Sequence, residues 1–232
     1  MKIKKHLITA ILLLGLSSVV SIVIGQEKED TDRSLTYLAL GDSYTIGESV
    51  DVDQQWPKQL RRALDSLGMK VQEPKIIAKT GWRTDDMLNV AKEEVGASQY
   101  DMVSLLIGVN NEYQGRSPKS FVDEFEKCLK FAIDHCKTGL KGVFVLSIPD
   151  YGYTPFGAEN QKQISARLDA YNKICRKICK KYDVLYINIT DISREVPEDD
   201  SLVAKDQLHP SGEQYSMWVE RALDRVRKLY VG

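Results

Sequence analysis

Five short apolar runs, separated by longer segments with helical spacing, constrain the fold of this chain more than any other feature of its sequence. Each run is continuous and does not alternate between polar and apolar residues. A continuous run is typical of a parallel strand that helices cover on both faces. The runs are Leu35–Leu40, Lys75–Ala78, Met102–Ile107, Val143–Ile148 and Val184–Ile189.

The segments between these runs carry the start and stop signals of helices. Proline stands near the first turn of two of them, and Gly68 ends one. Ser211 and Gln214 have the spacing of a capping box in front of the last helix. The predicted helices begin at Trp56-Pro57, at Thr84 as a cap, at Ser117-Pro118, near Ile164 and after Ser211.

Strands that alternate with helices predict an α/β fold. We expect a three-layer α/β/α sandwich of the flavodoxin-like kind, built on one doubly wound, five-stranded parallel sheet. In such a sheet the ligand lies beyond the carboxyl ends of the strands, near the point where strand order reverses. Residues 35–232 contain no repeat or linker, and we take them as one domain.

The first 25 residues differ from the rest of the chain. Three lysines precede an apolar run at residues 7–24, and small residues end the run near Gly25. This layout is typical of a cleaved secretory signal peptide. An uncleaved membrane anchor is the alternative, because the run is about 18 residues long. We expect residues 1–25 to be a signal peptide, residues 26–34 a polar leader, and the protein to be secreted or periplasmic.

The net charge of −1 becomes −4 when residues 1–25 are removed, because they hold three lysines and no acidic residue. A nucleic-acid partner would need a concentrated basic face, which this balance does not favour. We therefore expect no nucleic-acid partner, and no stable membrane insertion after signal cleavage. The oligomeric state is left open.

Four cysteines lie in two segments that are expected to be helical: Cys128, Cys136, Cys175 and Cys179. An even number in an oxidising compartment allows disulfides, and we expect one bridge between the two helices. Buried free thiols, acting as small hydrophobic side chains, are an equal alternative. The spacings do not match a zinc site, and no metal is expected.

Ser43 stands where the first strand is expected to end, in the sequence Gly41-Asp42-Ser43-Tyr44. A serine in a Gly-flanked turn between a strand and a helix has an exposed hydroxyl and can act as a nucleophile. The same residues are also ordinary turn chemistry. Taken alone, this segment does not decide between the two interpretations.

Gly81 and Asn110 follow the second and third strands, at the same edge of the expected sheet. A glycine N–H and an asparagine amide are donors that stabilise the oxyanion of a tetrahedral intermediate. The alternatives are a tight strand exit for Gly81 and a loop position with unusual backbone angles for Asn110.

His209 is the candidate base. Only one other histidine follows residue 25, and that one, His135, stands at a helix end, where it interacts with the helix dipole. A serine hydroxyl is a poor nucleophile at neutral pH without a base. A nucleophilic role for Ser43 and a role as base for His209 therefore support one another. Asp206, three residues earlier, is close enough to orient the imidazole and fix its tautomer.

Together these segments resemble the SGNH hydrolases, the family of GDSL-type esterases and lipases. That family has Gly-Asp-Ser-Leu near the N-terminus, an isolated Gly, a Gly-x-Asn-Asp segment and a late Asp-x-x-His pair. The matching segments here, in the same order, are Gly41-Asp42-Ser43-Tyr44, Gly81, Gly108-Val109-Asn110-Asn111 and Asp206-Gln207-Leu208-His209.

The resemblance implies that Ser43 attacks an ester carbonyl, that His209 accepts its proton and that Asp206 supports the imidazole. It also implies an oxyanion hole formed by the Ser43 and Gly81 N–H groups and the Asn110 side chain. No cofactor is implied.

Two residues depart from the family pattern. Tyr44 replaces the leucine and touches none of the implied catalytic roles. Asn111 replaces the usual aspartate, and we expect this change to alter how the loop that carries Asn110 is braced.

Three aromatic residues are candidates for substrate contact. Trp82 is adjacent to Gly81, while Tyr151 and Tyr153 follow the fourth strand. The alternative is a stiff surface loop whose aromatic rings pack on the core.

The predicted activity is hydrolysis of small or short-acyl esters through an acyl-enzyme, with a small-molecule ester as the binding partner. The lack of a long apolar lid segment favours small acyl groups. One alternative is a lysophospholipase- or thioesterase-type acyl hydrolase. These enzymes and short-acyl esterases use the same catalytic residues and differ in the shape of the substrate pocket. The other alternative is a secreted binding module that keeps the fold without catalysis.

Overall fold

All five predicted runs form strands of one parallel sheet in the computed structural model, which describes residues 34–230. The strand order is β2-β1-β3-β4-β5, and every neighbouring pair is parallel. The predicted doubly wound sheet is therefore confirmed. The strands are β1 Tyr37–Asp42, β2 Lys75–Lys79, β3 Met102–Leu106, β4 Val143–Leu146 and β5 Leu185–Ile187.

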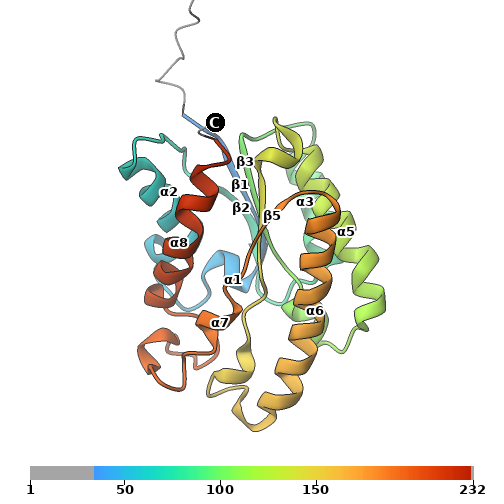
Figure 1. The fold of residues 1–232 in the computed structure, drawn as a ribbon, viewed down its shortest axis with the longest axis vertical. Helices are drawn as coiled ribbons and strands as arrows, with labels where there is room; N and C mark the ends of the chain where they lie inside the picture. Colours follow the sequence, from blue (N-terminus) through green and yellow to red (C-terminus); the bar gives the residue numbers. More distant parts are fainter. Residues whose placement is uncertain (1–33, 231–232) are drawn as a thin grey trace, which may run out of the picture. The chain divides into compact units, whose positions relative to one another are not determined.

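Helices cover both faces of the sheet (Figure 1). Helices α2 and α8 pack together on one face, while α5 lies between α3 and α6 on the other. The helices are α1 Ser43–Ile46, α2 Trp56–Ser66, α3 Thr84–Val95, α4 Val109–Tyr113, α5 Pro118–Asp134, α6 Gln161–Lys181, α7 Thr190–Ser193 and α8 Gly212–Arg227. The 3-10 turns are η1 Val52–Gln54, η2 Gly139–Gly142, η3 Tyr151–Tyr153, η4 Ala158–Asn160 and η5 Asp200–Leu202.

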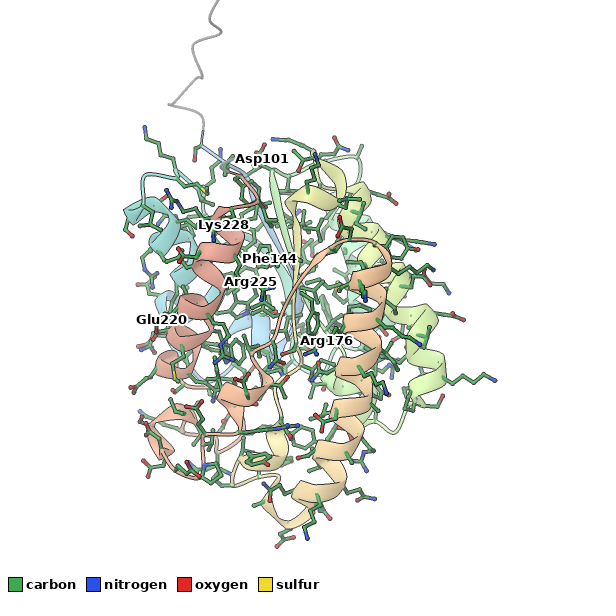
Figure 2. All side chains as sticks on the ribbon, viewed as in Figure 1. Asp101, Phe144, Arg176, Glu220, Arg225 and Lys228 are labelled. Atoms are coloured by element: carbon green, nitrogen blue, oxygen red, sulfur yellow. The ribbon has the colours of Figure 1, made fainter. Side chains whose placement is uncertain are left out.

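The core lies between these layers. Phe144 on β4 is fully buried between the sheet and the α2–α8 layer, where its ring contacts Trp56 (Figure 2). Glu220 and Lys228 point outward from α8. Burial of such large rings is the main favourable contribution to folding, and it holds the strand ends in fixed positions.

The strand order reverses at β1. The chain crosses from β1 to β2 on one side and then returns past β1 to form β3 on the other. The segments that leave β1 and β3 therefore separate at this point, and a crevice opens between them. Ser43 leaves β1 and Gly108 follows β3, so both predicted segments are at the crevice.

Two predicted helix caps are wrong in detail. Helix α3 begins at Thr84 and is capped by the preceding Arg83, whose N–H donates to Asp86. Ser211 does cap α8 by accepting a bond from the Gln214 N–H. The Gln214 side chain, however, donates to the Leu202 carbonyl and does not complete the capping box.

The predicted disulfide is also wrong, because all four cysteines are free and buried. The Cys128 thiol contacts the Thr84 carbonyl, and the Cys136 thiol contacts the Asp101 carbonyl. Burial raises the pKa of Cys128, Cys175 and Cys179, which keeps these thiols protonated. The cysteines therefore match the alternative prediction, in which buried free thiols act as small hydrophobic side chains.

The predicted signal peptide at residues 1–25 lies outside the described residues, as does the leader up to residue 33. Within residues 34–230, no helix combines the length and the apolar character needed to span a membrane.

Candidate active site

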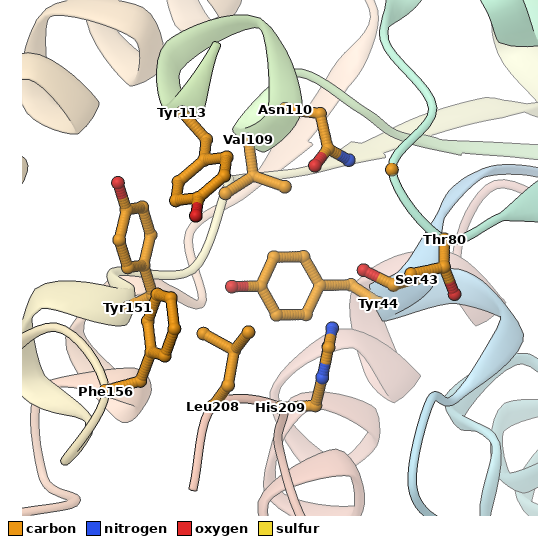
Figure 3. Close-up of a pocket in the computed structure, with 11 residues that line it drawn as sticks. Ser43, Tyr44, Thr80, Val109, Asn110, Tyr113, Tyr151, Phe156, Leu208 and His209 are labelled. Atoms are coloured by element: carbon orange, nitrogen blue, oxygen red, sulfur yellow. The ribbon is translucent and has the colours of Figure 1, made fainter. Parts of the chain in front are cut away.

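A cavity of about 240 Å³ opens at the carboxyl ends of β1, β2 and β3. Figure 3 shows Ser43, Thr80 and His209 at one end of this cavity and an aromatic group at the other. Its walls come from five regions that are far apart in the sequence. They are Ser43, Tyr44, Thr80, Gly81, Val109, Asn110, Tyr113, Tyr151, Phe156, Leu208 and His209.

Ser43 is the first residue of α1, directly after β1. Asp42 caps this helix by accepting a bond of 3.1 Å from the Tyr44 N–H. The Asp42 carboxyl is fully buried, and its second oxygen has no partner within residues 34–230. Burial raises the pKa of Asp42 to about 7, against the lowering effect of bonds from the Tyr44 and Gly108 N–H groups.

His209 and Asp206 form a tight pair. The His209 Nδ1 lies 2.6 Å from Asp206 Oδ2, and the His209 N–H donates to Oδ1 at 2.9 Å. The hydroxyl of Ser49 donates to the same Oδ2 at 2.6 Å. Partial burial acts to raise the pKa of Asp206, but the bonds from Ser49, His209 and Leu208 outweigh it and lower the pKa to about 2. Asp206 is thus an ionised acceptor for the ring.

The two predicted oxyanion donors beyond Ser43 also line the cavity. Gly81 has φ +81°, and within residues 34–230 its N–H makes no hydrogen bond. The Asn110 amide donates one N–H to the Trp82 carbonyl at 2.9 Å. An amide carries two N–H groups, so this contact fixes the Asn110 side chain and leaves the second N–H for a ligand.

Asn111 braces the loop that carries Asn110. Its amide oxygen accepts from the Thr84 N–H at 3.1 Å, and its nitrogen donates to the Thr84 hydroxyl and to Glu124, each at 2.7 Å. A carboxylate at this position would face Glu124 without a proton between them. The Asn111 amide fits this acidic neighbour, because it supplies N–H donors that a carboxylate lacks.

A family model for GDSL-like lipases and acylhydrolases matches residues 39–217. The match covers most of the chain and includes all the segments described above. The chain belongs to the GDSL-like lipase/acylhydrolase family. The predicted resemblance and the prediction of a carboxylic ester hydrolase are thereby confirmed.

Individual proteins resemble this chain in sequence or in structure. An acetylxylan esterase from Geobacillus stearothermophilus is 25% identical over 162 residues, which cover 66% of this chain and 69% of that protein. The lipase/acylhydrolase from Enterococcus faecalis has a similar structure, with a TM-score of 0.67 at 18% identity, over 84% of this chain and 96% of that one. The esterase EstA from Pseudoalteromonas sp. also has a similar structure, with a TM-score of 0.66 at 14% identity. The similarity covers 86% of this chain and 100% of that one.

The three aromatic residues predicted to contact substrate differ in their position relative to the cavity. Tyr151 lines the cavity, but Trp82 and Tyr153 do not. Trp82 packs partly buried against the core, and only its carbonyl serves the site, through Asn110. Tyr153 lies under the Arg194 guanidinium, 5.7 Å from ring centroid to Arg194 Cζ.

Several lining residues had no signal in the sequence. Tyr113 follows the Asn110 segment by three residues, on the exposed side of α4, and its ring contacts Tyr151 and Phe156. Leu208 lies inside the Asp-x-x-His segment, where only the polar residues attract attention. No group of three or more potential metal ligands occurs within residues 34–230.

Proposed function

We propose that this chain is a secreted serine esterase that hydrolyses small or short-acyl esters through an acyl-enzyme. Ser43 is the nucleophile, His209 the general base, and Asp206 the residue that orients it. One observation carries the proposal: the ionised Asp206 holds the His209 ring at 2.6 Å in the cavity that Ser43 lines.

The hydrogen bond to Asp206 requires the proton of the neutral imidazole to be on Nδ1. His209 Nε2 is then free to take the Ser43 hydroxyl proton as Ser43 Oγ attacks the ester carbonyl carbon. His209 next delivers that proton to the departing alcohol, which leaves an acyl group on Ser43. A water molecule attacks this acyl group, with its proton passing through His209 back to Ser43.

The attack places negative charge on the former carbonyl oxygen. The N–H groups of Ser43 and Gly81 and the second N–H of Asn110 are the donors that would stabilise it. Because these donors are fixed by the strand exits and by the bond to Trp82, they need no reorganisation as the charge develops.

The size of the cavity supports a short acyl group. Its volume of about 240 Å³ lies below the roughly 300–1,000 Å³ of sites for drug-sized ligands. The acetylxylan esterase of Geobacillus stearothermophilus, which by its name removes acetyl groups, supports the same substrate class.

Replacement of Ser43 by alanine tests the mechanism. We expect Ser43→Ala to lower kcat for p-nitrophenyl acetate at least about a thousandfold and to abolish labelling by a fluorophosphonate. Ser216→Ala, on the exposed face of α8, is the matched control and should retain both. Turnover in Ser43→Ala equal to that of the wild type would rule out this nucleophile.

Export is the remaining part of the proposal. The basic start and apolar run of residues 1–25 support secretion with cleavage near Gly25. Mass spectrometry of the protein from the natural host should give a chain that begins at about Gln26. A full-length chain held in the membrane fraction would indicate the anchor instead.

A further inference from the structure

The hydroxyl of Tyr44 projects into the cavity without a partner in the protein. Tyr44 is only 3% exposed, and its ring packs edge-on against His209 and Trp218. Figure 3 shows the hydroxyl in the middle of the cavity, between Leu208 and the aromatic group. No residue within 34–230 forms a hydrogen bond with it.

Three other buried tyrosines of this protein have a partner for the hydroxyl, while the Tyr215 hydroxyl, which does not line the cavity, has none within residues 34–230. Tyr37 pairs with Ser104, Tyr151 donates to Glu112, and Tyr171 donates to the Arg116 carbonyl. A buried hydroxyl that loses water without gaining another partner destabilises the state in which it is buried. A hydrocarbon chain that filled the cavity would cover Tyr44 in this way.

The Tyr44 hydroxyl stays neutral. Burial, together with the nearby Asp42 carboxyl, raises its pKa well above the ordinary value. It therefore offers one O–H donor and its lone pairs to whatever enters the cavity. The surrounding walls, formed by Val109, Leu208 and the aromatic rings, are apolar. The Tyr44 hydroxyl can therefore form a hydrogen bond with a ligand where the neighbouring surfaces cannot.

We propose that Tyr44 is a specificity-determining residue, whose hydroxyl bonds an oxygen carried by the part of the ester that fills the cavity. The preferred substrates are then oxygen-bearing esters, such as acylated polyols, and simple alkyl esters are poorer. The inference rests on the proposed esterase function. The oxygen belongs to either the alcohol or the acyl part, and matched substrates separate the two.

A second cavity, with a more polar lining, adjoins the first. It has a volume of about 360 Å³ and shares Tyr113, Tyr151 and Phe156 with the first cavity. Its far side is formed by polar side chains, among them Asn160, Gln163 and Arg167. A substrate that crosses the shared aromatic rings therefore meets hydrogen-bonding groups at both ends, which suits a hydroxylated molecule.

Substrates that differ only by an ether oxygen in place of a CH2 test the proposal. The first pair, 2-methoxyethyl acetate and butyl acetate, carries the change in the alcohol. The second pair, methyl methoxyacetate and methyl butyrate, carries it in the acyl group. In Tyr44→Phe, the ratio of kcat/KM for the ether ester to that for the alkyl ester should fall about three- to tenfold in one pair. The pair that responds identifies the part of the substrate that Tyr44 contacts.

The ratio cancels differences in intrinsic reactivity and in the amount of folded enzyme. Tyr182→Phe, which removes a hydroxyl that contacts Glu126 away from the cavity, is the matched control and should leave both ratios unchanged. Unchanged ratios in Tyr44→Phe, with the wild type active on all four esters, would overturn the proposed role of Tyr44 and would leave the esterase function standing. A wild type that cleaves none of them would overturn the esterase function itself, and this inference with it.

Discussion

At the scale of single residues, Ser49 has a larger role than its exposed position suggests. Its hydroxyl donates to the same Asp206 oxygen that holds His209, although the two residues are 157 positions apart. Ser49 also has φ +67°, a left-handed conformation that costs a non-glycine residue about 1 kcal/mol. Strain of this kind is retained where the surrounding structure requires it, often at functional sites.

Replacement of Ser49 by glycine and by alanine separates its hydroxyl from its backbone strain. Both changes remove the bond to Asp206, so we expect kcat to fall about three- to tenfold in each, with little change in KM. Loss of the donor also raises the pKa of Asp206 toward the ordinary carboxyl value. Glycine relieves the strain, so only Ser49→Gly should raise the melting temperature. Equal kcat values for both variants and the wild type would contradict this role.

Some residues of the site are predictable from the sequence, and others are not. Ser43 and His209 were predicted because their segments have a recognisable composition, and both line one cavity. Ser49 and Tyr44 could not be predicted, because their roles depend on which distant side chain or cavity they face. Trp82 does not line the cavity, because adjacency to Gly81 in the sequence does not fix the direction of its side chain.

At the scale of elements, the strands were predictable because a buried parallel strand must be continuously apolar. The β1 and β3 runs were placed within about two residues of their observed ends, which is the usual uncertainty of element boundaries. Caps were less predictable. Gln214 was free to bond either the Ser211 N–H or the Leu202 carbonyl, and only the tertiary structure brings Leu202 within reach.

The Asn111 contacts join three elements, because Asn111 on α4 bonds Thr84 at the start of α3 and Glu124 on α5. We expect Asn111→Asp to destabilise the protein by about 1–3 kcal/mol, since a carboxylate there loses a buried donor and faces Glu124. Glu124→Gln should restore most of this loss in the double variant, because its amide can donate to the new carboxylate. Urea unfolding of the wild type and the three variants measures the coupling. Strictly additive effects would show that the two side chains do not interact.

At the scale of the whole molecule, two carboxyl groups make stability depend on pH in opposite directions. Asp206 has a pKa lowered to about 2, so its contribution is present above about pH 4 and is lost as the pH falls toward 2. Asp42 has a pKa raised to about 7, so the folded protein holds a proton that the unfolded chain releases near pH 4. Stability from Asp42 is therefore greatest below pH 4 and declines as the pH rises to 7.

Between pH 5 and pH 8, Asp42 titrates and Asp206 does not. Across this range the wild type should lose about 3 kcal/mol of unfolding free energy through Asp42, at about 1.4 kcal/mol for each pH unit up to 7. Asp42→Asn keeps an oxygen for the Tyr44 N–H and cannot ionise, so its stability should fall less over the same range. The difference between the two curves, measured by urea unfolding at each pH, removes the contributions of groups that both proteins share. Parallel curves would mean that Asp42 is ionised in the folded protein despite its burial. The second oxygen opposes that state, because it is buried and accepts no hydrogen bond within residues 34–230.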